Sequence, residues 1–325
     1  MRPSSCSIVL LTNCMFRCKM CEMWKSKDSP YQVSTEEWKR FIDSLVGLLD
    51  DPRELVFSGG EPLLRKDTLE LIRFGTDRGF KTLMPSNAYL IGEDMAKGIR
   101  DSGLKETCIS LDSTNPKTHD FLRGQDGSHE RVMKGFENLH RHCPDLKIGI
   151  ITVISGVNYT EVIDLIKWVK ETGFISGIYF QAIAKPFFVH LDNNWHMQEQ
   201  YGFLWPRDVG DMHSMLDQLI DMRKSGYPIH NFPLQLEIFK TYFKDPTKRA
   251  RKAKCYLGDY VINTDPSGNI SLCCFKEPIG NIKKDDIKSL WFSEKAILMR
   301  SQMHTCNVNC NNMVNCFFKE EEENE

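Results

Sequence analysis

The first 185 residues alternate between short runs of apolar, often β-branched residues and segments whose apolar residues recur at helical spacing. Capping-type start signals at Ser34–Glu37 and Asn158–Glu161 precede two of the helical segments. Strands that alternate with helices at this spacing predict successive βα units, and therefore an α/β fold with a parallel sheet closing into an open or incomplete barrel. The predicted strands are Cys6–Leu11, Glu54–Phe57, Lys81–Met84, Thr107–Leu111, Ile148–Ile154 and Gly177–Gln181, each followed by turn-forming residues.

This alternation ends near residue 185. The next segment is rich in aromatic residues and predicts one clear helix over Val209–Lys224, and a basic run, Lys244–Lys254, leads into a cysteine-rich stretch. We therefore expect a barrel over residues 1–185, a bridging segment over 186–250, a small module over 251–318 and a disordered acidic tail over 319–325.

Composition and charge exclude several classes of protein. The 325 residues are 41% hydrophobic and 26% charged with a net charge of −2, which excludes a generally disordered chain and gives no global reason to expect nucleic acid or an anionic membrane as partner. The longest early apolar run, Ile8–Leu11, is too short for a signal peptide, and no run is long enough to span a membrane. We expect a cytoplasmic protein, in which spaced cysteines are more often metal ligands or catalytic thiols than disulfides. Of its 12 cysteines, we expect Cys6, Cys108, Cys143 and Cys274 to be ordinary small hydrophobic residues.

Three of these cysteines, Cys14, Cys18 and Cys21, follow the first predicted strand with the spacing C-x3-C-x2-C. Three thiolates this close together can bind one cuboidal iron–sulfur cluster and leave its fourth iron open. A structural zinc site would need a fourth ligand, and no histidine occurs in the first hundred residues. A chance cluster of buried thiols is the remaining alternative.

The segment Asn13–Cys21 resembles the radical S-adenosylmethionine (SAM) superfamily. In that family SAM chelates the open iron of a 4Fe–4S cluster, and one-electron reduction cleaves it to methionine and a 5′-deoxyadenosyl radical. A second motif, Gly59, Gly60, Glu61 and Pro62 after the second strand, resembles the family's Gly-Gly-Glu-Pro segment, which binds the methionine amino group of SAM. Small glycines permit such a close backbone approach. The resemblance implies a partial (βα)6 barrel of the TIM type.

Further positions follow the carboxyl ends of predicted strands, where parallel βα folds build their sites. In family members the corresponding positions contact the ribose and methionine of SAM. They are Ser86, Asn87, Ser110, Asp112 and Asn158. Met20 stands where the family often has an aromatic residue, and Ala88 stands where it usually has glycine.

The C-terminal cysteines form a second group. Cys255 and Cys273 are joined by the spacing C-x12-G-x4-C through Gly268, with a predicted hairpin turn at residues 265–269 and a predicted helix near 289–300. Cys306, Cys310 and Cys316 follow as C-x3-C-x5-C. The arrangement resembles the SPASM or shortened "twitch" extension of many radical SAM enzymes, although its last cysteine is replaced by Glu320.

A count of thiols favours one auxiliary 4Fe–4S cluster. Two four-cysteine clusters need eight thiolates, and the region has only six cysteines, including Cys274. Cys255 and Cys273 are the firm pair, and two of Cys306, Cys310 and Cys316 complete the set, the last two preserving the family's x5 spacing. A structural zinc knuckle is the alternative.

The resemblance implies hydrogen abstraction from a substrate, with the auxiliary cluster as electron acceptor in a two-electron oxidation. Because neither end of the sequence looks like an added peptide-binding domain, we expect a small molecule such as a carbohydrate or an aminocyclitol. A peptide- or protein-modifying maturase is the alternative, and a non-catalytic iron–sulfur carrier or zinc-binding module is the alternative of a different class. Flavodoxin or ferredoxin is the expected electron donor, and the basic run Lys244–Lys254 is either a solvated linker or its docking surface.

Overall fold

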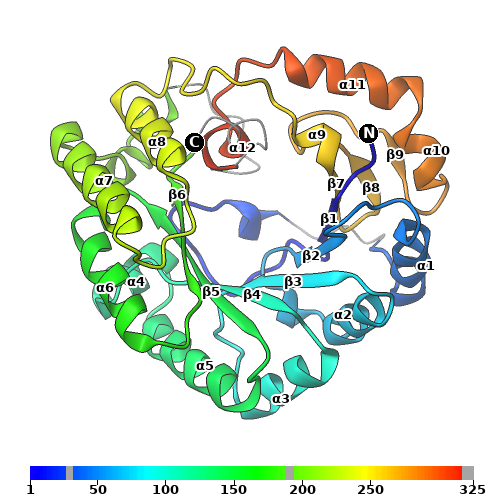
Figure 1. Ribbon diagram of the computed structural model, residues 1–325, viewed down its shortest axis with the longest axis horizontal. Coiled ribbons are helices and arrows are strands. Elements are labelled where there is room, and N and C mark those ends of the chain that lie inside the picture. The colour runs from blue at the N-terminus through cyan, green and yellow to red at the C-terminus, as the bar shows by residue number, and fades with distance from the viewer. Residues whose placement is uncertain (27–31, 187–193, 317–325) are drawn as a thin grey trace.

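The computed structural model describes residues 1–26, 32–186 and 194–316. Six parallel strands lie in chain order along one curved sheet, which confirms the predicted α/β fold and parallel sheet. Figure 1 shows these strands as an open arc rather than a closed barrel. The strands are β1 (Ser5–Val9), β2 (Glu54–Ser58), β3 (Lys81–Ser86), β4 (Glu106–Ser110), β5 (Lys147–Ile154) and β6 (Gly177–Ala182).

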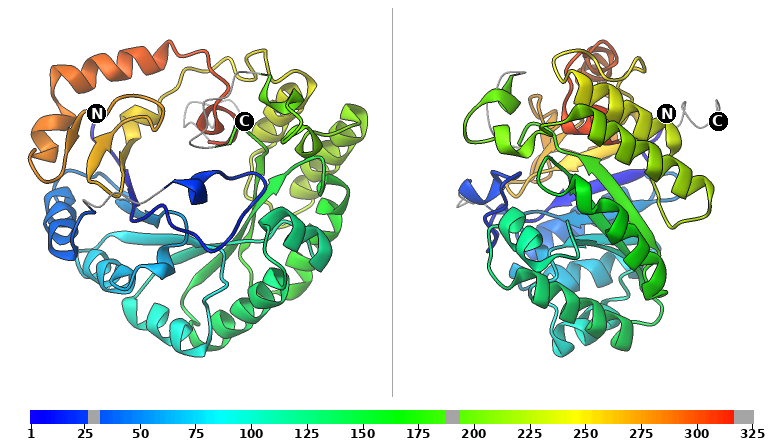
Figure 2. Two further views of the ribbon diagram at one scale, coloured as in Figure 1. Left: turned by 180° about the vertical axis from the view of Figure 1, so that it is seen from behind. Right: turned by 90° about the vertical axis from the view of Figure 1, so that its left-hand side faces the viewer.

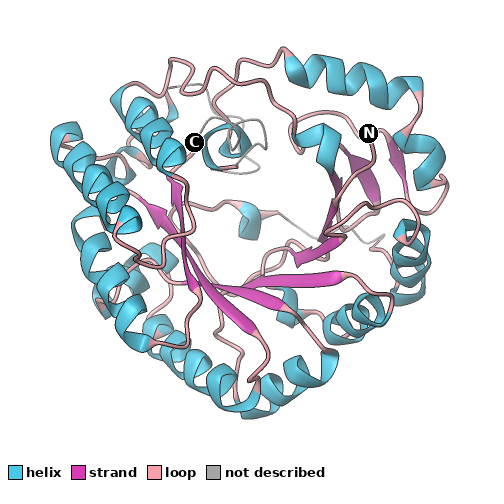
Figure 3. Cartoon of the chain, in the orientation of Figure 1, coloured by secondary structure: helices cyan, strands magenta, loops and turns pink. Residues whose placement is uncertain are grey.

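Helices cover the outer face of the arc (Figure 3). In the first of them, Ser34 and Glu37 form the predicted capping box, and four buried side chains at helical spacing, from Trp38 to Leu45, face the sheet. The outer helices are α1 (Thr35–Leu45), α2 (Thr68–Asp77), α3 (Glu93–Ser102), α4 (Pro116–Arg123), α5 (Ser128–His142) and α6 (Val162–Thr172), with short 3-10 turns η1 (Met23–Lys25), η2 (Pro62–Leu64) and η3 (Tyr159–Glu161).

The start signal at Asn158–Glu161 does not cap a helix. The Asn158 side chain makes no capping hydrogen bond. Instead its Oδ1 accepts from the Ser155 amide at 2.9 Å, and its Nδ2 donates to the Asp112 carbonyl at 2.9 Å. The side chain is therefore drawn into the space between two strand ends, and α6 begins only after the turn η3.

The rest of the chain completes the arc and adds a small module. The helix predicted over Val209–Lys224 is present, whereas the single helix predicted near residues 289–300 is two helices, because Ser293 caps a new one through the Ala296 amide. The elements are η4 (Trp195–Met197), η5 (Gly202–Leu204), α7 (Val209–Lys224), α8 (Pro233–Lys244), α9 (Leu257–Tyr260), β7 (Val261–Thr264), β8 (Asn269–Ser271), β9 (Gly280–Asn281), α10 (Ile287–Trp291), α11 (Glu294–His304) and α12 (Asn311–Asn315).

The C-terminal module is built on the first strand of the arc. β7 pairs in parallel with β1, and the predicted hairpin joins β7 to β8 in antiparallel fashion. The sheet order is therefore β6-β5-β4-β3-β2-β1-β7-β8-β9, and Figure 2 shows the module beside the N-terminal strand. The predicted domain boundaries stay a prediction, but the sheet continues across the one at residue 251. The predicted tail, residues 319–325, lies outside the described residues, as does part of the bridging segment.

The other edge of the arc, β6, pairs at Ile178 with the backbone of residues 228–230, and two asparagine side chains cover it further along. Asn231 accepts from the Phe180 amide at 2.7 Å and donates to the Phe180 carbonyl at 2.9 Å. Asn315, the last residue of α12, does the same with Ala182 at 2.8 and 3.0 Å. Each amide group thus supplies the donor and the acceptor that a neighbouring strand would supply. As a result, α12 is fixed to the end of β6.

Within residues 1–26, 32–186 and 194–316, no helix is long and apolar enough to cross a membrane.

Candidate active site

A cavity of about 360 Å³ lies where the strands of the arc end. Its walls come from the loop after β1, from the ends of β2 to β6 and from α12. This is the edge at which parallel βα folds place their sites. The lining residues are Cys14, Phe16, Cys18, Met20, Cys21, Met23, Trp24, Gly59, Gly60, Pro85, Ser86, Asn87, Ser110, Arg123, Ile151, Val153, Gln181, Ala182, Ile183, Ala184, Lys185 and Asn311.

The structure therefore brings together most of the residues that the sequence singled out. All three N-terminal cysteines line the cavity, together with Gly59, Gly60, Ser86, Asn87 and Ser110. Four predicted SAM contacts do not line it. They are Glu61, Pro62, Asp112 and Asn158, which lie buried behind the cavity wall.

The two glycines hold the cysteine loop against the sheet. The Gly60 amide donates to the Leu11 carbonyl at 3.0 Å, and the Glu61 amide donates to the Asn13 carbonyl at 3.0 Å. A Cβ on Gly60 would lie 2.2 Å from the Asn13 carbonyl oxygen, and one on Gly59, whose φ is +149°, would lie 2.4 Å from that of Leu11. Only glycine permits this approach immediately before Cys14.

Glu61 stabilises the wall of the cavity through hydrogen bonds. Its carboxylate accepts hydrogen bonds from the Leu63 amide at 3.2 Å, the Ser86 hydroxyl at 2.9 Å and the Asn87 amide at 2.8 Å. Burial raises the pKa of this carboxyl group to about 7, although the hydrogen bonds act in the opposite direction. Glu61 thus ties the end of β2 to the end of β3 and fixes the two cavity-lining residues Ser86 and Asn87.

The backbone after Asn87 is left-handed at Ala88, the position where the family usually has glycine. Ala88 has a φ of +57°, in the left-handed region that glycine adopts most readily. Its methyl group packs close to Gly135 of α5, where an added Cβ would lie 3.1 Å away.

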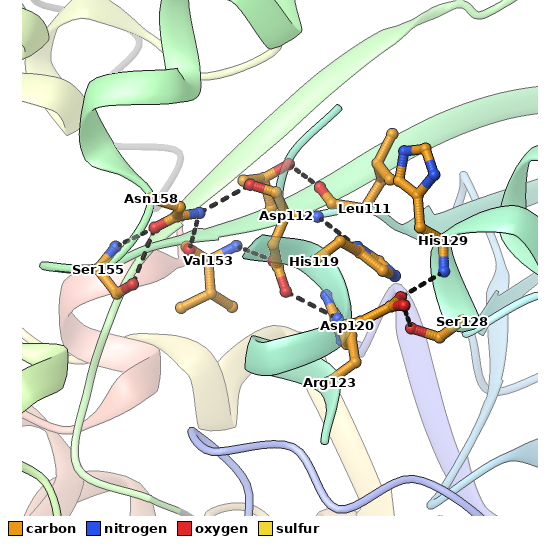
Figure 4. A network of polar contacts seen from close by, with 11 residues as sticks. Leu111, Asp112, His119, Asp120, Arg123, Ser128, His129, Val153, Ser155 and Asn158 are labelled. Atoms are coloured by element: carbon orange, nitrogen blue, oxygen red, sulfur yellow. Dashed lines mark hydrogen bonds and ion pairs between the residues drawn. The ribbon is translucent and has the colours of Figure 1, made fainter. Parts of the chain in front are cut away.

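Asp112 and Asn158 support Arg123, as Figure 4 shows. Asp112, 1% exposed, forms an ion pair with Arg123 at 2.7 Å and also accepts from the Val153 amide at 3.1 Å. Asn158 donates to the Asp112 carbonyl at 2.9 Å. Arg123 lines the cavity and lies beside Cys18, so the ion pair with Asp112 holds the guanidinium group in place next to the cysteine loop.

A neutral histidine completes this network. The Nδ1 atom of His119, which is fully buried, accepts from the Asp112 amide at 3.3 Å. Burial lowers the pKa of His119 to about 2, with Arg123 and His129 acting in the same direction. Next to it, the Asp120 carboxylate accepts from the amides of Gly127 and His129 at 2.7 Å and so fixes the start of α5.

The environment of the three cysteines fits thiolate ligands of an iron–sulfur cluster. The Phe16 amide donates to the Cys14 sulfur at 3.4 Å, and the Asn87 side chain approaches the same sulfur at 3.8 Å. Such N–H···S contacts are typical of cluster cysteines. Burial raises the pKa of all three thiols, that of Cys18 to about 12, so metal binding is needed to keep them deprotonated.

In the described part of the chain, no three His, Cys, Asp or Glu side chains converge closely enough to share one metal ion. A cuboidal cluster makes no such demand, because each of its thiolates binds a separate iron.

A second cavity, of about 570 Å³, lies in the C-terminal module. Five of the six cysteines of the module line it, namely Cys255, Cys273, Cys274, Cys306 and Cys310. Cys316 does not; it lies at the other end of α12, where its carbonyl accepts from Arg251 at 2.7 Å. A hydrogen bond from the Cys274 thiol lowers the pKa of Cys273.

The two cavities share two residues, Lys185 after β6 and Asn311 at the start of α12. The sequence carried no signal for Asn311, or for Asn231 and Asn315 at the edge of β6. Single asparagines in loops and helix ends have no spacing that would mark them.

Comparisons with known proteins agree with this geometry. A model of the radical SAM superfamily matches residues 8–169, and a model of the SPASM iron–sulfur cluster-binding domain matches residues 255–316. The chain is 32% identical over 168 residues to an AdoMet-dependent heme synthase of Methanosarcina barkeri, covering 51% of this chain and 47% of the relative. It is 34% identical over 169 residues to a GTP 3′,8-cyclase of a Picosynechococcus species, covering 49% of this chain and 50% of the relative.

Solved structures with the same fold cover nearly the whole chain. The anSMEcpe enzyme with bound AdoMet and Cp18Cys peptide has a TM-score of 0.68 at 18% identity, covering 97% of this chain and 88% of that one. Streptococcus suis SuiB bound to the precursor peptide SuiA has a TM-score of 0.68 at 15% identity, covering 97% of this chain and 71% of that one.

Fold and site together define an enzyme of the radical SAM type with a C-terminal iron–sulfur module. The chain belongs to the radical SAM superfamily, in the subgroup that carries a SPASM domain. Membership implies a SAM-binding 4Fe–4S cluster and an auxiliary iron–sulfur cluster. The chain spans about half the length of the relatives that it matches in sequence.

Proposed function

We propose that this enzyme carries out a two-electron oxidation of a small molecule such as a carbohydrate or an aminocyclitol. The bound cluster and SAM supply a 5′-deoxyadenosyl radical, which takes one hydrogen atom from the substrate. A cluster held by the cysteines of the second cavity would accept the second electron, and a proton would leave to water. The observation that carries the proposal is that the two cavities meet at Lys185 and Asn311, so a substrate beside the first cavity lies next to the second.

Different residues of the first cavity are proposed to bind different parts of SAM. We propose that Cys14, Cys18 and Cys21 bind the cluster and that the backbone of Gly59 and Gly60 receives the methionine amino group. Ser86, Asn87 and Ser110 line the same wall and present polar groups to the ribose and carboxylate. Glu61, Asp112 and Asn158 act one step behind this wall, since they contact the lining residues Ser86, Arg123 and Val153 respectively.

For the auxiliary cluster we propose Cys255, Cys273, Cys306 and Cys310 as ligands; all four line one cavity, which the exposed Cys274 lines as well. Cys316, which keeps the x5 spacing of the family, is the competing fourth ligand. Single Cys→Ser variants decide between Cys306 and Cys316. We expect Cys306→Ser to lose the auxiliary iron and Cys316→Ser to retain it. The measurement is the amount of iron per chain after anaerobic reconstitution. The opposite result assigns Cys316 as the ligand.

The names of the relatives support a small-molecule substrate, because they mention heme and GTP. A second candidate, a peptide substrate, is supported by the whole-chain likeness to enzymes whose structures hold peptides. The two candidates differ in the source of the abstracted hydrogen.

Deuterium transfer tests the proposal directly. The loaded enzyme is incubated with reductant, SAM and deuterated candidates of both classes, and the mass of the released 5′-deoxyadenosine is measured. We expect label from a small-molecule alcohol, with a product lighter by two hydrogens. Label only from peptides would overturn the small-molecule proposal.

A control with all three N-terminal cysteines changed to alanine is expected to release no 5′-deoxyadenosine. SAM cleavage by that variant would contradict the assignment of the site. Absence of cleavage by the loaded wild-type enzyme would favour a non-catalytic iron–sulfur carrier.

A further inference from the structure

We infer that the mouth of the auxiliary-cluster cavity is the docking site of a small acidic protein that carries single electrons. The inference rests on the proposed role of the auxiliary cluster as electron acceptor. The contact is made by a set of cationic residues that we call the basic collar: Lys244, Lys248, Arg249, Lys252, Lys254 and Lys276.

The cavity opens to solvent through apolar and cysteine side chains. Cys274, Phe275 and Val308 all line the cavity, and all three are exposed, the last two by 48% and 52%. An apolar centre at the mouth of a redox cavity, surrounded by charge, has the composition of a protein interface with a buried core and a polar rim.

Hydrogen bonds fix the basic loop to this mouth. The Asn309 side chain accepts from the Ala250 amide at 3.0 Å and donates to the Lys248 carbonyl at 2.6 Å. The Arg249 guanidinium donates to the Asn307 side chain at 3.0 Å. Asn307 and Asn309 flank the exposed Val308, so the loop that carries Lys248 and Arg249 is held beside the opening.

The charge of this region differs from that of the whole molecule. The chain has a net charge of −2, but residues 244–254 carry five of the six collar cations, and the sixth, Lys276, lines the cavity. Two acidic groups accompany these cations in the sequence. Those acidic groups are Asp245, which pairs with Lys248 at 3.0 Å, and Glu277, which lines the cavity. Five of the six collar residues are exposed. A local excess of positive charge attracts an acidic partner and orients it toward the cavity.

The electron step at this contact is simple. The reduced auxiliary cluster loses one electron, and the oxidised carrier gains it; no bond is made or broken and no proton moves. The carrier thereby restores the auxiliary cluster to the state that accepts an electron from the next substrate.

Oxidised flavodoxin serves as the probe. The experiment uses the full-length chain in which Cys14, Cys18 and Cys21 are alanine, so that the auxiliary cluster is the only electron source. This background cleaves no SAM, and the outcome is therefore independent of whether substrate oxidation is the correct function. The auxiliary cluster is reduced chemically, the excess reductant is removed, and formation of flavodoxin semiquinone is followed by stopped-flow absorbance at low and high salt.

Two pairs of substitutions with the same change in charge are compared. Lys248→Glu with Lys252→Glu alters the collar, and Lys134→Glu with Lys167→Glu alters the outer helices α5 and α6. Lys248, Lys134 and Lys167 each pair with an acidic residue three positions away, so the local disruption is matched. Iron content is measured for both, so that a misfolded variant is recognised.

We expect the collar pair to lower the second-order rate constant about tenfold at low salt, the control pair to leave it nearly unchanged, and the difference to shrink at high salt. Equal rates in the two pairs at full iron content would overturn the inference. It would also be overturned if deletion of the acidic residues 320–325 raised the rate while the collar pair left it unchanged, since the chain's own acidic end would then be what the collar binds.

Discussion

At Gly60 the loop before Cys14 packs so closely against the end of β2 that no side chain fits between them. In Gly60→Ala the new methyl group would lie 2.2 Å from the Asn13 carbonyl oxygen, so the loop before Cys14 must move. We expect weaker SAM binding and a loss of about 1–3 kcal/mol of stability. Gly92→Ala is the matched control, because Gly92 has a φ of −79° and open space around it.

Equilibrium dialysis with the loaded enzyme measures SAM binding, and denaturant unfolding measures stability. Equal behaviour of the two alanine variants would show that the Gly60 contact does not shape the site.

His119 makes the stability of the folded chain depend on pH. Its pKa is about 2 in the folded chain and about 6.5 when unfolded, so below pH 6.5 the unfolded chain takes up a proton that the folded one does not. The stability contributed by neutral His119 is therefore complete above pH 6.5 and falls as the pH drops, by about 2 kcal/mol at pH 5. Denaturant unfolding at pH 7.5 and pH 5 measures this loss.

The His119→Gln variant is expected to lose less stability than the wild type between these two pH values. His140→Gln, at an exposed ring stacked on Phe174, is the control and should behave as the wild type does. A pH dependence unchanged by His119→Gln would contradict the assignment.

At the scale of elements, the edge of β6 connects the two cavities. Asn315 closes this edge and ends α12, whose two flanking residues are Cys310 and Cys316. In Asn315→Leu the Ala182 amide and carbonyl lose their partners, at a cost of about 1–3 kcal/mol for each buried group. We expect lower stability and also lower auxiliary iron, because α12 carries a cysteine of the second cavity.

Asn231→Leu is the matched control, because it removes the equivalent pair of hydrogen bonds, those to Phe180. Asn231 itself lies in a loop that contains no cysteine. The Asn231→Leu variant should lower stability and leave iron per chain unchanged. If both variants kept full iron, α12 would not depend on β6 for its position.

At the scale of the whole molecule, the module and the barrel share one sheet. A chain that ends at residue 250 would lose β7 and expose the edge of β1. Because exposed strand edges pair with other chains, we expect this truncated chain to aggregate and to retain less of the catalytic cluster than a chain ending at residue 318. Size-exclusion chromatography and iron analysis under anaerobic conditions test this, and a monomeric truncated chain with four irons would show that the barrel folds independently.

The sequence predicted the fold well because its signals are local. All six barrel strands, the capping box at Ser34 and the hairpin around Gly268 follow from alternation, caps and turn residues within short windows. The assignment of the site residues stays a prediction, but residues chosen for their cysteine and glycine spacing line one cavity. The hydrogen bonds of Glu61, Asp112 and Asn158 were not predicted, because they join residues 25 to 46 positions apart in the chain.

The sequence by itself determined the α/β architecture, the cysteine clusters and the family, since each depends on residue types at fixed spacing. Only the tertiary structure decided that the module continues the barrel's sheet through β1 and that Asn315 closes β6. It also decided that two cavities meet at Lys185 and Asn311. These features join segments far apart in the chain, and a contact between such segments is fixed by packing and by the need to pair buried polar groups, which leave no periodic pattern in the sequence.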